Sequence, residues 1–168
     1  MNDIVTLLKK AMQSERDGYH HYNRAAEMTK DQKAKEVFRG LANDELLHHR
    51  ALEDILTEYQ TRGSLPEIQP LSLPGNLPSK DFSPIFSENF KERLTDAHGE
   101  ISAISIGMVL EQNAINFYGD LSQRAENSSL KTFFSNLADW EKIHLEALSL
   151  QMEFVRDEYW ARSQFHPF

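Results

Sequence analysis

The 168-residue sequence contains no cysteine. This absence excludes disulfides, thiolate zinc sites, iron–sulfur clusters and cysteine nucleophiles. Basic residues are also scarce, because 18 Lys and Arg stand against 26 Asp and Glu, which gives a net charge of −8. Nucleic acids and anionic membrane surfaces are bound through clustered basic side chains. We therefore expect neither as a partner.

Long hydrophobic runs are missing too. No apolar stretch reaches the roughly 20 residues that a membrane-spanning helix needs. The first residues, MNDIVTLLKKAMQSERDGY, mix acidic and basic side chains where a signal peptide would have an apolar core. We therefore expect a cytoplasmic protein, and the length predicts a single domain over residues 1–168.

Proline is nearly absent outside one segment. Five of the six prolines lie in residues 63–84, GSLPEIQPLSLPGNLPSKDFSP, where no helix or strand pattern survives. On both sides, Pro-free charged segments with helical periodicity predict four long helices, over 3–29, 31–61, 99–126 and 128–160. Two helical hairpins joined by a long crossover form the ferritin-like variant of the four-helix bundle. The predicted fold class is therefore all-α.

Two smaller features accompany these helices. Ser83 and Pro84 form a good N-cap and first-turn pair, which predicts a short helix after the crossover. Residues 156–168 form an aromatic-rich C-terminal extension. We expect it to continue the last helix and to dock on a neighbouring subunit, because so many exposed aromatic side chains are unusual in a monomer.

The two halves of the sequence resemble each other at an offset of 96 residues. Between residues 4–55 and 100–151, 11 of the 52 aligned pairs are identical. Amphipathic helices share a small alphabet, so some apolar matches arise by chance. The polar matches are more specific: Glu15/Glu111, Tyr22/Tyr118, Glu45/Glu141 and His48/His144.

Each predicted helix carries an apolar stripe that is interrupted near its middle by Glu, or by Glu and His three residues later. Four carboxylates and two imidazoles therefore occupy core positions at one level of the bundle: Glu15, Glu45, His48, Glu111, Glu141 and His144. Burying even one unpaired ion costs several kcal/mol. Six such groups need a counter-charge.

Two divalent metal ions balance the charge of four glutamates, and the two neutral imidazoles complete the ligand set. Glu and His at positions i and i+3 project from one helical face, so each Glu-x-x-His motif can address a metal ion. Oxygen-rich ligation with one imidazole per ion favours iron or manganese over structural zinc. The alternative is a set of buried ion pairs without metal.

Four segments that contain these residues resemble the rubrerythrin-like branch of the ferritin-like superfamily: SERDGYHHY, LANDELLHH, LEQNAINFY and LADWEKIHLEAL. The resemblance covers nearly all of residues 3–155. It implies that Glu45 and Glu141 bridge two iron ions, for which manganese or zinc could substitute. One ion would then be completed by Glu15 with His48 and the other by Glu111 with His144. Tyr22 and Tyr118 would steer the carboxylates through hydrogen bonds, the alternative being plain core packing.

The sequence departs from the rubrerythrin pattern in two ways. Full-length rubrerythrins carry a rubredoxin-like domain with four cysteines, which this chain lacks, so any electron donor is expected to be a separate protein. Rubrerythrins also carry an additional Glu one turn after the third-helix ligand, where this chain has Ala114, and the equivalent position in the first half is Gly18. The predicted centre is therefore more symmetric and closer to that of a bacterioferritin.

Other polar residues near the stripes have simpler interpretations. His20, His21 and His49 are expected to be solvated or packed at helix flanks. Asp44 and Asp139 either orient the imidazoles or face solvent. Trp140 stands where some family members have Asp, and indole cannot accept a hydrogen bond.

The predicted function is oxidation of a diferrous centre by hydrogen peroxide or dioxygen, in a peroxidase or ferroxidase that forms a homodimer. A non-catalytic iron-binding or storage-related protein is the first alternative. A structural bundle with a vestigial site is the second.

Overall fold

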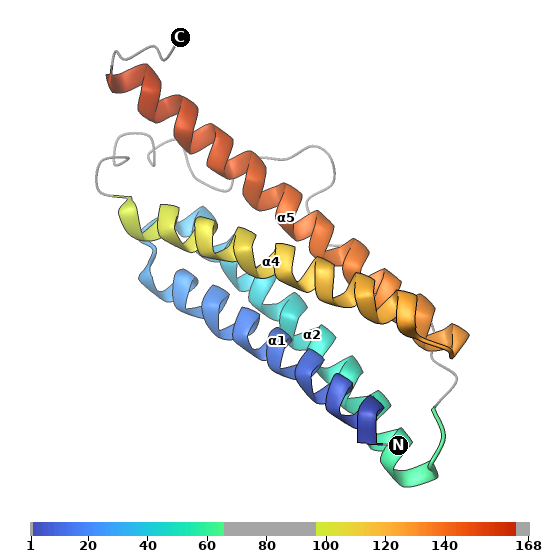
Figure 1. Ribbon diagram of the computed structural model, residues 1–168. Coiled ribbons are helices and arrows are strands. Elements are labelled where there is room, and N and C mark those ends of the chain that lie inside the picture. The colour runs from blue at the N-terminus through green and yellow to red at the C-terminus, as the bar shows by residue number, and fades with distance from the viewer. Residues whose placement is uncertain (1, 66–96, 164–168) are drawn as a thin grey trace.

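The computed structural model describes residues 2–65 and 97–163, and all regular structure within these ranges is helical (Figure 1). The helices are α1 (Asn2–Met28), α2 (Gln32–Arg62), α4 (His98–Arg124) and α5 (Ser128–Ser163). The four predicted long helices are therefore confirmed, with every end within three residues of its expected position. The predicted crossover falls almost entirely outside the described residues, and the expected short helix after Ser83 lies outside them altogether.

The second helix of each hairpin begins at an equivalent polar cap. At the start of α2, the Asp31 carboxylate accepts a hydrogen bond from the Ala34 amide at 2.9 Å. At the start of α5, Asn127 accepts one from the Leu130 amide at 3.0 Å. Asp31 and Asn127 are 96 residues apart, so the internal repeat extends to the turns that set the two hairpins.

The four helices pack as two antiparallel hairpins, α1 with α2 and α4 with α5, and α1 lies against α4 between them (Figure 1). This is the ferritin-like four-helix bundle that the sequence predicts. Among the described residues, no helix is long and apolar enough to cross a membrane.

Two clusters of buried apolar residues fill the bundle, and every helix contributes to both. One cluster includes Tyr22, Phe38, Ile104 and Leu148. The other includes Leu8, Leu52, Tyr118 and Phe134. Along each helix, the predicted polar core positions fall between its contributions to the two clusters. The polar layer is therefore enclosed by apolar packing at both ends.

The predicted stripes are buried along most of their length. Six other residues that helical spacing places on these stripes are half-buried, at the edges of the inward faces: Met12, Tyr19, Tyr59, Ile101, Met108 and Ile115. The last helix continues past its predicted end to Ser163, with Val155 buried. Docking of the C-terminal extension on a neighbouring subunit stays a prediction.

Candidate metal centre

The six polar residues of the stripes lie together in the middle of the bundle. One Glu comes from α1 and one from α4, while α2 and α5 each supply Glu and His one turn apart. None is more than 4% exposed: Glu15, Glu45, His48, Glu111, Glu141 and His144. Side chains that ionise in water are rarely buried so completely without a partner that compensates their charge.

The six side chains form two overlapping groups, each compact enough for one metal ion. The first consists of Glu15, Glu45, His48 and Glu141, and the second of Glu45, Glu111, Glu141 and His144. Within each group, one nitrogen or oxygen atom per residue lies within 4.8 Å of all the others. Glu45 and Glu141 belong to both groups, as carboxylates that bridge two ions would.

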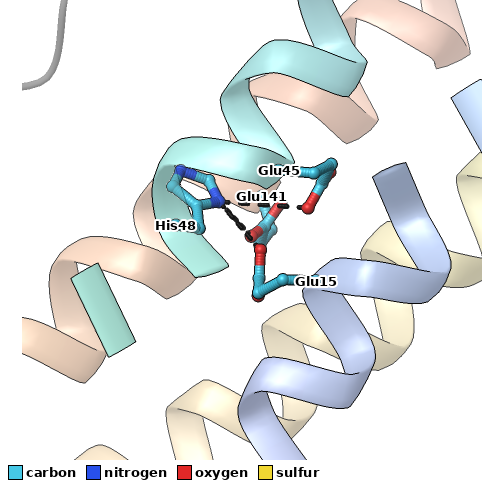
Figure 2. Close-up of side chains that lie close together, drawn as sticks. All are labelled: Glu15, Glu45, His48 and Glu141. Atoms are coloured by element: carbon cyan, nitrogen blue, oxygen red, sulfur yellow. Dashed lines mark hydrogen bonds and ion pairs between the residues drawn. The ribbon is translucent and has the colours of Figure 1, made fainter. Parts of the chain in front are cut away.

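In the first group, His48 directs one ring nitrogen at the carboxylates (Figure 2). Its Nδ1 lies 3.0 Å from Glu15 Oε2 and 3.3 Å from Glu141 Oε1. Glu45, one turn away on α2, approaches the same nitrogen at 4.0 Å. Residues from α1, α2 and α5 thus converge on one point.

The second group repeats this arrangement. His144 Nδ1 lies 3.2 Å from Glu141 Oε2 and 3.6 Å from both Glu45 Oε1 and Glu111 Oε1. Both imidazoles therefore present the same ring nitrogen to the carboxylates. Their other ring nitrogens point away from the centre.

Two tyrosines, one on each side of this layer, connect the hairpins. Tyr22 of α1 donates its hydroxyl hydrogen to Glu111 of α4, and Tyr118 of α4 donates to Glu15 of α1. Both tyrosines are fully buried. Each hydrogen bond occupies one oxygen of a carboxylate that belongs to a single ligand group and so limits its rotation.

Burial and mutual repulsion hold protons in this layer when no metal is bound. Burial raises the pKa of Glu45, and repulsion from the other carboxylates, Glu141 foremost, raises it further. Burial also raises the pKa of Glu111 to about 7, although the nearby imidazole of His144 opposes the shift. The same environment raises the pKa of Tyr22 and Tyr118, through burial and then through Glu111 and Glu15.

The imidazoles respond in the opposite sense to burial. Burial lowers the pKa of His48, but the charge of Glu141 outweighs this effect and the pKa rises well above its usual value. The pKa of His144 is raised in the same way, because Asp44 and the carboxylates of Glu111, Glu141 and Glu45 outweigh the effect of burial. Burial would raise the pKa of Glu141, but the two imidazoles bring it well below its usual range. The layer of four carboxylates and two imidazoles therefore attracts positive charge.

Metal ions fit this arrangement better than buried ion pairs do. Several ligand-type atoms are buried without any hydrogen-bond partner: both oxygens of Glu141 and Nδ1 of His144. In the part of the chain that the structure describes, the ion pairs of the four carboxylates are formed with the two imidazoles and with no Lys or Arg. Such a donor set, rich in carboxylate oxygen with two imidazoles, suits iron or manganese.

A cavity of about 160 Å³ lies between α1 and α4 and leads to this layer. Its buried wall includes Glu15, Glu45 and Glu111, while Asp17 and Asn113 line it at the exposed surface. Gly18 and Ala114 also line it. The repeat pairs Asp17 with Asn113 and Gly18 with Ala114, so this cavity follows the internal symmetry and could have been anticipated from it.

Gly18 lies close to Glu45, one of the two carboxylates that the ligand groups share. A Cβ atom at residue 18 would lie 3.0 Å from Glu45 Cδ and 3.2 Å from Glu45 Oε2. Gly107 has a similar relation to Tyr22, whose hydroxyl would lie 3.0 Å from an added Cβ. The sequence pattern marks Gly18 only as a position without a carboxylate and gives no signal for Gly107.

Of the remaining polar residues that the sequence singles out, Asp44 contacts one of the ligand candidates, and the other acidic residue and the histidines do not belong to the ligand groups. Asp44 Oδ2 lies 3.4 Å from His144 Nε2, whereas Asp139 is 63% exposed and pairs with Lys142 at 2.8 Å. His21 contacts the Ala103 carbonyl oxygen at 2.9 Å. His20 is exposed and His49 is half-buried, and neither belongs to the ligand groups. Trp140 is buried against both imidazole rings.

Comparison with known proteins supports the resemblance that the sequence indicates. The rubrerythrin family model matches residues 3–69, which include α1, α2 and the ligand candidates Glu15, Glu45 and His48. No curated protein and no solved structure matches the chain. The second hairpin carries the equivalents of these three ligand candidates, each 96 residues later in the chain: Glu111, Glu141 and His144. This chain is thus a ferritin-like four-helix protein with a rubrerythrin domain match in its first hairpin.

Proposed function

We propose that the protein is a di-iron carboxylate oxidoreductase, in which a diferrous centre is oxidised by hydrogen peroxide or dioxygen. The observation that carries the proposal is the pair of overlapping ligand groups that share Glu45 and Glu141. Structural zinc sites are closed and are usually built from thiolates and imidazoles. A paired, carboxylate-rich group beside a cavity is instead typical of di-iron proteins with redox chemistry.

When bound, the iron pair supplies electrons to the oxidant. The side chains of the protein hold the two ions, restrain the carboxylates and exclude water. Glu15 with His48 and Glu111 with His144 hold the two positions, and the shared carboxylates keep them adjacent. Tyr22 and Tyr118 restrain the non-bridging carboxylates. The two apolar clusters exclude water from either end of the layer.

The cavity between α1 and α4 is the proposed route for the oxidant. Its volume of about 160 Å³ accommodates dioxygen or hydrogen peroxide but not a large organic substrate. Asp17 gives its outer part a negative charge, which also favours entry of Fe²⁺. We further propose that a separate protein donates electrons for repeated turnover, and that the chain acts as a homodimer in the cytoplasm.

The test is anaerobic loading of the full chain with Fe²⁺, followed by stopped-flow mixing with hydrogen peroxide and with oxygenated buffer. The proposal expects two ions per chain and rapid oxidation of both by at least one oxidant, in a particle the size of a dimer on a sizing column. Glu141→Gln is the inactive comparison and Asp139→Asn is the surface control.

Other outcomes would replace the proposal. A cage-like assembly that retains oxidised iron would indicate storage. Absence of Fe²⁺ binding would leave a structural bundle with a vestigial site.

A further inference from the structure

The outer ring nitrogens of the two imidazoles differ in whether a carboxylate lies beside them. The residue before Glu45 is Asp44, and the residue at the equivalent position, before Glu141, is Trp140. Asp44 Oδ2 lies 3.4 Å from His144 Nε2. Trp140, which carries no acceptor, packs edge-on against His48, with ring centroids 5.5 Å apart and planes at 85°, and also against His144, at 6.0 Å and 84°. The internal repeat is therefore broken at a pair of residues that contact the two ligand candidates.

This difference leaves one outer ring nitrogen facing an acceptor and the other without one. His48 Nε2 and His144 Nε2 are both buried without a hydrogen bond. Among the described residues, His144 Nε2 nevertheless has the Asp44 carboxylate 3.4 Å away, and His48 Nε2 has no such neighbour. The indole nitrogen of Trp140 is likewise buried and unpartnered, and as a donor it cannot accept a proton from the imidazole. The 3.4 Å contact of His144 with Asp44 is longer than a normal hydrogen bond, but it places a carboxylate within reach of that nitrogen.

The outer nitrogen matters because both rings turn Nδ1 toward the carboxylates. An imidazole that ligates through Nδ1 carries its proton on Nε2. A carboxylate that accepts this proton holds the ring in the correct tautomer and orientation and increases its basicity as a ligand. A buried N–H without an acceptor makes ligation less favourable.

We propose that the two metal positions differ in affinity, and that Asp44 is the positioning residue that makes the Glu111/His144 position the tighter one. The Glu15/His48 position then fills second, because Trp140 provides no acceptor for its imidazole. This inference rests on the proposed metal centre. It assigns an order of filling that the near-symmetric ligand set alone does not provide.

The experiment is a titration of the metal-free full chain with Co²⁺, followed by visible absorption and by calorimetry. We expect two resolved binding steps with dissociation constants at least about tenfold apart. Asp44→Ala should weaken the first step by about 10–100-fold, the usual effect of losing such a partner, and should leave the second step nearly unchanged. Asp139→Ala is the matched control, since this exposed Asp precedes Glu141 by two residues and should alter neither step.

Two variants at Trp140 test whether the lack of an acceptor there weakens the Glu15/His48 position. Trp140→Phe retains an aromatic ring without an acceptor, so two separate steps should persist. Trp140→Asp restores the repeat and should bring the two dissociation constants closer together. If Trp140→Asp does not fold, Asp44→Ala and Trp140→Phe still decide the question.

The outcomes separate this inference from the proposed function. Two equal steps in the wild type, or equal weakening of both steps by Asp44→Ala, would overturn the inference while leaving the metal centre in place. Binding of fewer than two Co²⁺ ions per chain would instead overturn the proposed metal centre itself.

Discussion

Tyr118 on α4 donates its hydroxyl hydrogen to Glu15 on α1, 103 residues earlier in the chain. Tyr22 on α1 makes the reciprocal bond to Glu111 on α4. Each half of the protein therefore positions a carboxylate of the other half. The hydrogen bonds join the hairpins at the layer where the proposed metal ions bind.

Removing one of these hydroxyls should weaken metal binding. In Tyr118→Phe, Glu15 loses the bond that limits its rotation, so we expect Fe²⁺ affinity to fall by about 10–100-fold. Anaerobic calorimetry measures the change. Tyr59→Phe is the control, because Tyr59 is about three turns beyond His48 on α2 and outside both ligand groups. Equal affinity of Tyr118→Phe and wild type would show that Tyr118 serves only core packing.

Bridging and non-bridging carboxylates should differ in their effect on stoichiometry. Glu141 belongs to both ligand groups, so Glu141→Gln should weaken the binding of two ions. Glu15 belongs to one group, so Glu15→Gln should weaken the binding of one ion. Iron content per chain after gel filtration distinguishes the two variants. A wild-type content of one ion at saturating Fe²⁺ would contradict the two-metal arrangement.

The stability of the metal-free protein should fall as pH rises through neutrality. The pKa of Glu111 is about 7 in the folded state and 4.5 as its ordinary value, so the folded state binds more protons between these values. Its stabilising contribution is complete below about pH 4.5 and is lost as pH rises through about 7. The raised pKa values of His48 and His144 act in the same direction above 6.5.

Urea unfolding with a chelator present measures this effect. We expect the free energy of unfolding to decrease by on the order of 1–3 kcal/mol between about pH 5 and pH 8. Glu111→Gln should reduce the slope, because it removes one of the titrating groups. A rise in stability over the same range would indicate that the carboxylates are paired with permanent cations.

Gly18→Ala should impair metal binding without weakening the helix. Alanine favours helix over glycine by about 0.5–1 kcal/mol, but its Cβ would lie 3.0 Å from Glu45 Cδ and would displace that carboxylate. Gly40→Ala on α2 offers a matched control, since no heavy atom lies within 4 Å of its added Cβ. Thermal unfolding and Fe²⁺ titration of both variants separate the two effects. Unchanged affinity in Gly18→Ala would show that Glu45 has room to adjust.

Ala114→Glu should add a carboxylate to the cavity. Ala114 lies on α4 one turn after Glu111 and lines the cavity between α1 and α4. The variant restores the additional Glu of the rubrerythrin pattern, so we expect faster oxidation of the diferrous protein by hydrogen peroxide than in the wild type. Stopped-flow absorbance measures the rate. A slower reaction would indicate that the added side chain simply blocks the route.

The layer of six polar side chains could be predicted because helical periodicity determines which residues face inward. Glu45 and His48 share a face, and the 96-residue repeat places Glu141 and His144 at the equivalent level. The partners of Asp44 and Asp139 could not be predicted in this way. Both residues flank the stripes, and only the rotation of each helix in the bundle decides that Asp44 reaches His144 while Asp139 meets Lys142 at the surface.

Close contacts between hairpins were also beyond the sequence pattern. Gly107 leaves room for the Tyr22 hydroxyl, and Gly18 leaves room for Glu45. Each relation joins residues on different helices, so it depends on the distance between helix axes. The direction of the tyrosine hydroxyls depends on the same distance. Periodicity identifies inward faces but does not specify how closely two of them approach.

The division of the ligand groups has a consequence for how such a centre can diversify. Each hairpin supplies two Glu and one His to its own ligand group. Each ligand group also includes one shared carboxylate from the opposite hairpin. Two copies of one hairpin, related by a two-fold axis, would complete the same centre, but every substitution would then appear twice. Within a single chain the two halves can change independently. At one equivalent position, for example, the first half has Asp44 and the second half has Trp140. A dimer of identical hairpins would carry the same residue at both places.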